Sequence, residues 1–302
     1  MKDILFTKLH LLVVVFGLAS LFSSCIKEDL DACVKLTLMV VNHNDEDVTA
    51  LGVTSEAKLF VFDANSKLLE TRELDLDFIT GRKTIELPYP DNTKLHIVAW
   101  GNLKGKQNVT EPTKAEDLLV SLKSNNELAQ SPDSLFFGDI DVEVMGNGVA
   151  GGDKQIVIRP KTGTVEMRTI GLQYVYQKQG LRATSTECNF YMNRTLSAYN
   201  SKGELTGDSV YYNPEGDWKT TEWITPTPQT LYEGQKMTGS IEAGNKRYDV
   251  SKGEFEDGTV GPIEIYPFQK TLVVFEWDEK GAFLGAKIRV TPWGVVDDDI
   301  EF

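Results

Sequence analysis

The chain has 302 residues and a formal net charge of −14, with 45 acidic side chains against 31 basic ones. No basic patch stands out against this acidic surface, so nucleic-acid binding and broad contact with anionic lipid are disfavoured. The length exceeds what one small core usually organises and suits two domains.

Residues 1–24 have the layout of a secretory signal peptide. Lys2 and Lys8 precede an apolar run over residues 11–18, and small residues follow it. The run falls short of the roughly 20 apolar residues that a membrane-spanning helix needs. We therefore expect export of the chain followed by cleavage, rather than retention by a transmembrane helix.

The end of this segment, LFSSC at residues 21–25, resembles a bacterial lipobox. In such a motif a small residue precedes a cysteine that is acylated on sulfur and becomes the new amino terminus. Ser24 is then the small residue of the cleavage site, and Cys25 is the lipid acceptor. This resemblance implies a lipoprotein held in the cell outer membrane through acylated Cys25.

An acidic run, IKEDLD at residues 26–31, follows the cysteine. Lys27, Glu28 and Asp29 resemble the export signal that sends lipoproteins of the Bacteroidetes to the outer face of the outer membrane. The alternative is a solvated acidic tether without a sorting role. In both cases residues 25–33 form a polar tether, and several acyl chains on one cysteine make the anchoring stable.

Most of the remaining sequence predicts β-strands. Short strand-like runs, many of them with apolar residues at every second position, are separated by turn residues and predict an all-β sandwich or barrel. They cover residues 34–41, 57–63, 94–100, 153–160, 162–172, 270–278 and 285–293. Pro and Gly in NPEGD (213–217) predict a reversal of the chain. Only residues 113–126 predict a helix, with Leu118, Leu119 and Leu122 on one side.

The boundary between the two expected domains lies near residues 159–162. There one predicted strand runs into the next through Pro160 and Gly163. The expected domains, residues 34–160 and 161–302, are nearly equal in length.

Cys33 and Cys188 remain after lipidation of the first cysteine, and an oxidising compartment permits a disulfide between them. Strand periodicity argues against the pairing. It places Cys33 on the face opposite Val34, whereas Cys188 shares the apolar face of Phe190 and Met192. A buried thiol at 188 and a more exposed one at 33 is the favoured arrangement, with the disulfide as the alternative.

The sequence offers no constellation of catalytic or metal-binding residues. His43 and His96 lack the spacing of a metal site, and motifs for a nucleophile or a phosphate loop are missing. The acidic clusters at 42–49 and 297–301 lack the spaced ligands and glycine of a calcium loop. We expect no enzyme, no cofactor and no small-molecule substrate.

One aromatic cluster supports a different function. Tyr211, Tyr212, Trp218 and Trp223 flank the NPEGD turn and could stack on sugars. Because side chains alternate along strands, core packing for about half of them is the more ordinary explanation. A surface glycan-binding lipoprotein is therefore the alternative function.

Several stretches, taken in order, resemble the FimB-like family of Bacteroidales fimbrial anchor lipoproteins. They are CIKEDLDAC (25–33), KLHIVAWGNL (94–103), SLFFGDIDVEV (134–144), IVIRPKTGTVEMRTIGL (156–172) and IRVTPWGVV (288–296). The resemblance implies two tandem transthyretin-like β-sandwich domains. It also implies a fimbrial stalk subunit as partner, joined by donor-strand exchange, in which a strand of one subunit completes the sheet of another.

An anchor and a stalk subunit of this family differ in one feature that the sequence addresses. In stalk subunits a trypsin-like protease cuts after the first strand and removes the lipidated segment. Residues 36–57 contain no lysine or arginine, although Lys27, Lys35 and Lys58 flank them. We expect the lipid to be retained, so that the protein holds the base of a fimbrium and ends its growth; a stalk or tip subunit is the alternative.

The carboxy-terminal strand is the candidate for contact with the adjoining subunit. The segment runs from residue 287 to residue 296, and its apolar and polar residues alternate; the residues assigned to the contact are Lys287, Ile288, Arg289, Val290 and Thr291. This assignment comes from the terminal position of the strand and from its alternation.

Overall fold

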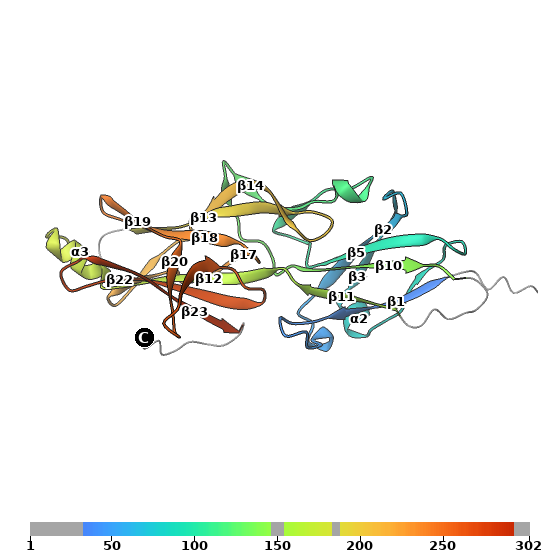
Figure 1. The fold of residues 1–302 in the computed structure, drawn as a ribbon, viewed down its shortest axis with the longest axis horizontal. Helices are drawn as coiled ribbons and strands as arrows, with labels where there is room; N and C mark the ends of the chain where they lie inside the picture. The colour runs from blue at the N-terminus through green and yellow to red at the C-terminus, as the bar shows by residue number, and fades with distance from the viewer. Residues whose placement is uncertain (1–32, 146–153, 183–187, 293–302) are drawn as a thin grey trace, which may run out of the picture.

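The computed structural model describes residues 33–145, 154–182 and 188–292. Over these residues the chain forms two groups of strands that lie one after the other along the long axis of the molecule (Figure 1). The helices are short: α2 (Leu76–Thr80), α3 (Leu172–Lys178) and two 3-10 turns, η1 (Thr49–Leu51) and η2 (Ala115–Asp117). None of the described helices is long and apolar enough to cross a membrane. The all-β class predicted from the sequence is confirmed.

The first group is a seven-stranded sheet. Its order is β3 (Leu68–Asp75), β2 (Glu56–Asp63), β5 (Lys94–Gly101), β10 (Phe136–Glu143), β11 (Lys154–Pro160), β1 (Val34–Val40) and β4 (Ile85–Leu87). β10 and β11 pair only at Phe136↔Pro160 and Phe137↔Arg159. The sheet therefore folds at this corner into two layers, β3-β2-β5-β10 and β11-β1-β4, which enclose an apolar core.

The second group is a sixteen-stranded sheet. Its main path runs through β15 (Asp217–Lys219), β16 (Glu222–Ile224), β12 (Thr162–Ile170), β22 (Gln269–Trp277), β23 (Phe283–Pro292), β20 (Lys252–Phe255), β21 (Val260–Glu264), β18 (Lys236–Ala243), β13 (Cys188–Tyr199), β14 (Leu205–Tyr212), β9 (Leu128–Ala129) and β8 (Ser124–Asn125). Beside this path lie β17 (Gln229–Tyr232), β19 (Lys246–Val250), β6 (Gln107–Val109) and β7 (Val120–Leu122).

This sheet also folds into two layers. β18 and β21 pair only at Lys236↔Glu264 and Met237↔Ile263, which leaves β12, β22 and β23 in one layer and β13, β14 and β18 in the other. Side chains from both layers meet in a second core, which includes Met167, Phe190, Met192, Ile241, Val273, Phe275 and Ile288. Alternation of side chains along each strand is what supplies one buried face per layer.

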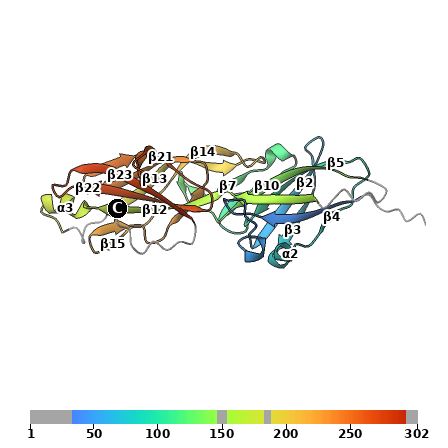
Figure 2. The ribbon, with the colours of Figure 1, turned by 60° about the horizontal axis from the view of Figure 1, so that its bottom comes forward.

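Strands from the first half of the chain take part in the second sheet. Between β5 and β10 the chain leaves the first sheet, and β7 pairs with β13 at Ser121↔Ala198 and Val120↔Tyr199. β9 pairs with β14 at Leu128↔Tyr211. This segment reaches across to β13 and β14 in both views (Figures 1 and 2). A domain boundary near residues 159–162 stays a prediction, since strands on both sides of it build the second sheet.

Aromatic side chains fill the junction between the two sheets. Trp100 of β5 is fully buried, and its ring centroid lies 4.8 Å from that of Phe137 and 5.7 Å from that of Tyr199. Tyr199 stacks in turn on Tyr232 at 4.4 Å, and its hydroxyl donates a hydrogen bond of 2.7 Å to the carbonyl oxygen of Lys161. One continuous core therefore runs from the outer face of β2 and β5 into the second sheet.

All seven strands predicted from the sequence are confirmed, within one or two residues at each end. The helix predicted over residues 113–126 is wrong. The segment holds the turn η2 and then β7 and β8. Leu118, Val120 and Leu122 are all buried, with a period of two, because β7 pairs with β6 on one side and β13 on the other. Pairing with distant strands outweighs the local helical pattern.

Replacing Trp100 by alanine is expected to lower the free energy of unfolding by about 3–5 kcal/mol, because it leaves a cavity where the two sheets meet. The measurement is urea denaturation followed by far-ultraviolet circular dichroism. Leu284→Ala is the control, since Leu284 is 64% exposed, and it should change stability by no more than about 0.5 kcal/mol. A loss below about 1 kcal/mol for Trp100→Ala would show that the junction core does not support the fold.

Candidate functional site

The first strand is fixed inside the first sandwich. β1 runs parallel to β11, with Leu36↔Lys154 to Val40↔Ile158 in register, and antiparallel to β4 over Val34 to Leu36. Its alternate side chains, Val34, Leu36, Leu38 and Val40, are buried, as the sequence predicted. Burying each such side chain contributes about 1.5–3 kcal/mol, so β1 is an integral part of the core.

The loop after β1 is held in place by Thr49 and Asp47. The Thr49 hydroxyl oxygen accepts a hydrogen bond of 2.9 Å from the backbone N–H of Val40. Asp47 accepts one of 3.0 Å from the backbone N–H of Thr49 and forms an ion pair with Arg82. Hydrogen bonds from Thr49 and from Arg82 lower the pKa of Asp47 to about 2. The loop is thereby tied to β1 and to the end of α2.

The structure shows how accessible the flanking lysines are to a trypsin-like protease. Lys35 lies within β1, where it pairs with Glu86 of β4 and its amine lies 3.2 Å from the Glu86 carboxylate. Lys58 lies within β2, which is paired with β3 on one side and β5 on the other. Proteases act on exposed, locally unpaired backbone, so both positions are protected in the folded chain. The exposed loop between them carries no basic residue.

The predicted contact strand belongs to the protein's own sheet. β23 pairs along its length with β22, and β20 covers its other side only at Glu254↔Lys287 and Phe255↔Ile288. Ile288 is fully buried, while Lys287 and Arg289 form ion pairs with Glu276 and Glu256. Val290 packs partly against the core, and Thr291 lies beside it. Residues 293–296 of the predicted segment lie outside the described residues.

The four aromatic residues of the glycan hypothesis do not form a common surface. Tyr212 and Trp223 are buried in the core, and Trp218 packs against Trp223 with ring centroids 5.5 Å apart. Tyr211 lies on the other face of the sheet, with its ring 6.4 Å from that of Tyr191. Core packing for about half of the four residues, the favoured explanation, is confirmed for Tyr212 and Trp223. The alternative, a sugar-stacking platform made by all four, is not formed, because alternation along β14 sends neighbouring rings to opposite faces.

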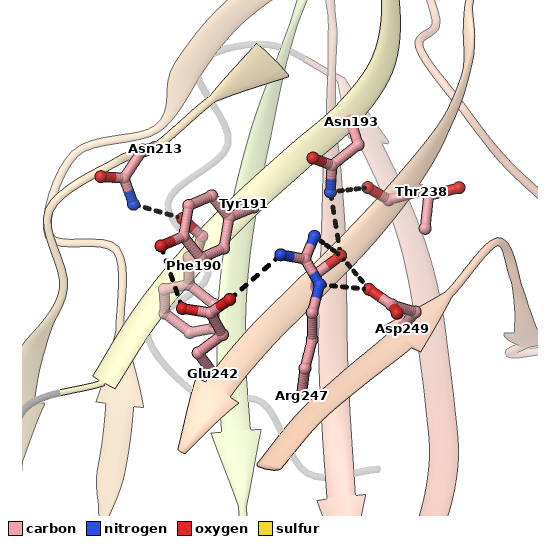
Figure 3. A network of polar contacts seen from close by, with 9 residues as sticks. Phe190, Tyr191, Asn193, Asn213, Thr238, Glu242, Arg247 and Asp249 are labelled. Carbon is pink, nitrogen blue, oxygen red and sulfur yellow. Dashed lines mark hydrogen bonds and ion pairs between the residues drawn. The ribbon is translucent and has the colours of Figure 1, made fainter. Parts of the chain in front are cut away.

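A charged network covers the outer face of β13, β18 and β19 (Figure 3). Arg247 lies over the ring of Tyr191 and donates hydrogen bonds of 3.1 Å to Glu242 and 2.9 Å to Asp249. Tyr191 donates one of 3.0 Å to Glu242. Hydrogen bonds from Ser240 and Arg247 keep the pKa of Asp249 below its usual value. The network fastens the edge strand β19 to its neighbours.

Sequence reasoning missed this network. The available signal was the alternation of Arg247 and Asp249 in KRYDV, which places both on one face of a strand. The partners on β13 and β18 are distant in sequence and follow only from the strand pairing.

The two remaining cysteines occupy the positions that strand periodicity favoured. Cys33, half-buried, precedes β1, and Cys188, buried, begins β13. Within the described chain no disulfide joins them. The Cys188 sulfur lies 2.8 Å from the Tyr176 hydroxyl, and burial raises the pKa of its thiol to about 11. The thiol stays protonated at neutral pH and is a weak nucleophile.

His96 and the acidic loop at residues 42–49 take part in ordinary polar contacts. His96 Nδ1 lies 2.8 Å from the Asp141 carboxylate, and Asp45 pairs with Arg159 at 2.8 Å. Among the residues that the structure describes, no group of three or more His, Cys, Asp or Glu side chains could hold a metal ion. Ser24, Cys25, Lys27, Glu28, Asp29 and the cluster at 297–301 lie outside the described residues.

Comparison with known proteins gives consistent results. Residues 28–299 match the family model of the fimbrillin-A associated anchor proteins Mfa1 and Mfa2. The chain is 28% identical to the major fimbrium anchoring subunit FimB of Porphyromonas gingivalis, over 96% of this chain and 97% of that protein. The fold is similar to that of two solved structures. A candidate adhesin from Bacteroides ovatus matches with a TM-score of 0.64 and 18% identity, over 89% of this chain and 96% of that chain. The fimbrial anchor protein Mfa2 from Porphyromonas gingivalis matches with a TM-score of 0.59 and 15% identity, over 86% of this chain and 98% of that chain.

Asp47→Asn is expected to destabilise the fold by about 0.5–1 kcal/mol at neutral pH, since the ion pair with Arg82 is partly exposed and screened. The folded-state pKa of about 2 lies below the ordinary 3.8, so the carboxylate stabilises the fold above about pH 4 and loses its effect as the pH falls towards 2. Urea denaturation of both proteins at neutral and acid pH measures this. If the difference in stability between the wild type and Asp47→Asn persists at about pH 2, the stabilising role of the Asp47 carboxylate is contradicted. Asp217→Asn, at an exposed position on the edge strand β15, is the control.

Proposed function

Because the chain belongs to the family of the fimbrillin-A associated anchor proteins Mfa1 and Mfa2, we propose that it anchors the base of a surface fimbrium. A lipid on Cys25 holds the protein in the outer membrane, and residues 25–33 form the tether to the first sandwich. The relatives named FimB have the anchoring function in Porphyromonas gingivalis.

The observation that carries this proposal is the position of β1. The strand directly follows the lipidated tether, and four of its side chains are buried between the two layers of the first sandwich. A load on the tether is therefore passed to the folded core through a paired strand. Cutting the chain after β1 would separate the lipid from the rest of the protein, so the anchor works only while this connection is intact.

The same strand accounts for the end of fimbrial growth. In donor-strand exchange, a subunit receives its neighbour's strand in a groove that opens when its own first strand has been removed. Here β1 occupies its place beside β11 and β4, and the loop from residue 41 to residue 55 offers no lysine or arginine for cleavage. A subunit that keeps β1 can donate a strand but cannot accept one, so assembly stops at this subunit.

The adjoining stalk subunit meets the carboxy-terminal segment in this proposal. Lys287 and Ile288 of β23 are covered by β20, and Ile288 is part of the core. β20 ends at Phe255, so from Arg289 onward one edge of β23 has no strand beside it among the described residues. Main-chain groups at a strand edge are what β-strand complementation uses. The joint is therefore expected at and beyond Arg289 rather than along the whole strand.

Mass spectrometry of the protein from native outer membranes tests the retained anchor. We expect an acylated Cys25 at the amino terminus of an intact chain. Leu51→Arg places a cleavage site in the loop at a side chain that is 74% exposed, and trypsin should then give a second fragment beginning at Gly52 on a denaturing gel. Leu51→Gln is the matched control and should give no fragment that begins at Gly52.

A mature wild-type chain that begins beyond residue 35 and lacks lipid would contradict the anchor and favour a stalk or tip subunit. Rapid trypsin cleavage of the folded wild-type chain at Lys35 or Lys58 would contradict the protection that β1 and β2 provide.

Truncation after Pro292 tests the joint with the stalk. It spares β23 and hence the core around Ile288, which deletion from residue 285 would destroy. The lipoprotein should remain on the cell while fimbriae appear in the medium, measured by electron microscopy and by immunoblotting of cells and supernatant. Fimbriae that stay attached at the wild-type level would refute a joint that depends on residues beyond 292.

A further inference from the structure

A cavity of about 400 Å³ opens where the two sheets meet. The loop after β1 contributes Asp45, and β10 contributes Phe137 and Asp139. Arg159 comes from β11, Lys161 from the link between β11 and β12, and Glu233 from the loop after β17. Its volume falls within the range of pockets that bind small ligands. Both halves of the molecule supply walls, so the cavity exists only because the junction is fixed.

The backbone explains why the space stays open. β10 and β11 pair at Phe136↔Pro160 and Phe137↔Arg159 and then diverge into different layers. At the point of divergence a Cβ on Gly138 would lie 2.1 Å from the carbonyl oxygen of Val157, so only glycine fits there. Any larger residue would force the two strands apart and change the shape of the cavity.

The charges that line the cavity are already balanced in pairs. Lys161 forms an ion pair with Glu233, and its amine lies 5.0 Å from the centre of the Tyr199 ring. Arg159 lies 2.8 Å from Asp45 at the rim. Asp139 adds one exposed carboxylate. A free anion would meet the carboxylates of both pairs, and a free cation would meet the guanidinium and the ammonium group, so neither is well matched.

The remaining groups favour a neutral ligand rich in hydroxyls. The half-buried ring of Phe137, held by Trp100, supplies an apolar wall. Beside it, carboxylate oxygens accept hydrogen bonds and the arginine and lysine nitrogens donate them.

We propose that this junction cavity binds a neutral saccharide residue, with its hydroxyls on Asp139, Arg159 and Lys161 and one face of its ring on Phe137. A sugar hydroxyl both donates and accepts, so it can bridge the members of an ion pair that exclude a charged ligand. The site differs from the aromatic cluster around Trp223, and it does not depend on the anchoring function. The protein would then bind glycan beside the fimbrial base.

The test is saturation-transfer NMR on the full lipoprotein in a detergent without a sugar headgroup, with lactose, maltose, mannobiose and N,N′-diacetylchitobiose as probes. At least one probe should bind saturably. Asp139→Asn should weaken that binding about tenfold, because a hydrogen bond to a charged group is lost, and Phe137→Ala should weaken it by a similar factor. Asp208→Asn, an exposed and matched change on β14 outside the cavity, should leave the affinity unchanged.

Three outcomes overturn the proposal: no saturable binding by any probe, binding that neither cavity variant weakens, or saturable binding of inorganic phosphate or free lysine in place of a saccharide. Because Phe137 also packs on Trp100, Asp139→Asn serves as the variant that leaves the core untouched. Cells carrying Asp139→Asn should keep their fimbriae, so failure of this proposal and failure of the anchoring function are told apart.

Discussion

The packing of Trp100 against Phe137 and Tyr199 is the contact on which the arrangement of the whole molecule depends. Trp100 projects from the first sheet, and Tyr199 belongs to a strand of the second. Because these rings are part of one continuous core, the two sheets are not joined merely by the short link between β11 and β12. Domains connected by a linker alone would be expected to move relative to each other; here a buried aromatic interface and the pairing of β7 with β13 oppose such motion.

A fixed junction suits the proposed function, in which the protein stands between a membrane and a filament. In the proposed function the load enters through the tether before β1 and leaves near the end of β23. β1 passes it to β11 and β4, the link at Lys161 leads to β12, and β12 lies beside β22, the partner of β23. Apart from the covalent link at Lys161, each step is a ladder of main-chain hydrogen bonds between strands packed on a core. Ladders that act together resist extension better than a flexible loop, whose ordering is easily lost.

The sequence predicted a strand correctly where the alternation of apolar and polar residues within that strand is enough to identify it. In β1 the alternation of Val34, Leu36 and Leu38 with polar residues identifies both the strand and its buried face, because successive side chains of a strand point to opposite faces of the sheet. The same pattern failed around Leu118, where three apolar residues fit one side of a helix as well as one face of a strand. This segment forms a strand because Val120 pairs with Tyr199, which lies 79 residues further along the chain. The local pattern of apolar residues cannot reveal a pairing over that distance.

The residues that line the junction cavity are even harder to predict from local sequence patterns. Asp45, Phe137 and Glu233 come from three separate parts of the chain and meet only after both sandwiches have formed and docked. No spacing in the sequence predicts their proximity, and the aromatic cluster that did attract attention, around Tyr212 and Trp223, is largely core. In an all-β protein the conspicuous aromatic residues are those that fill the sandwiches, since large apolar side chains contribute most when buried. The groups proposed to bind a saccharide lie instead at a corner where strands diverge, as β10 and β11 do beside Gly138.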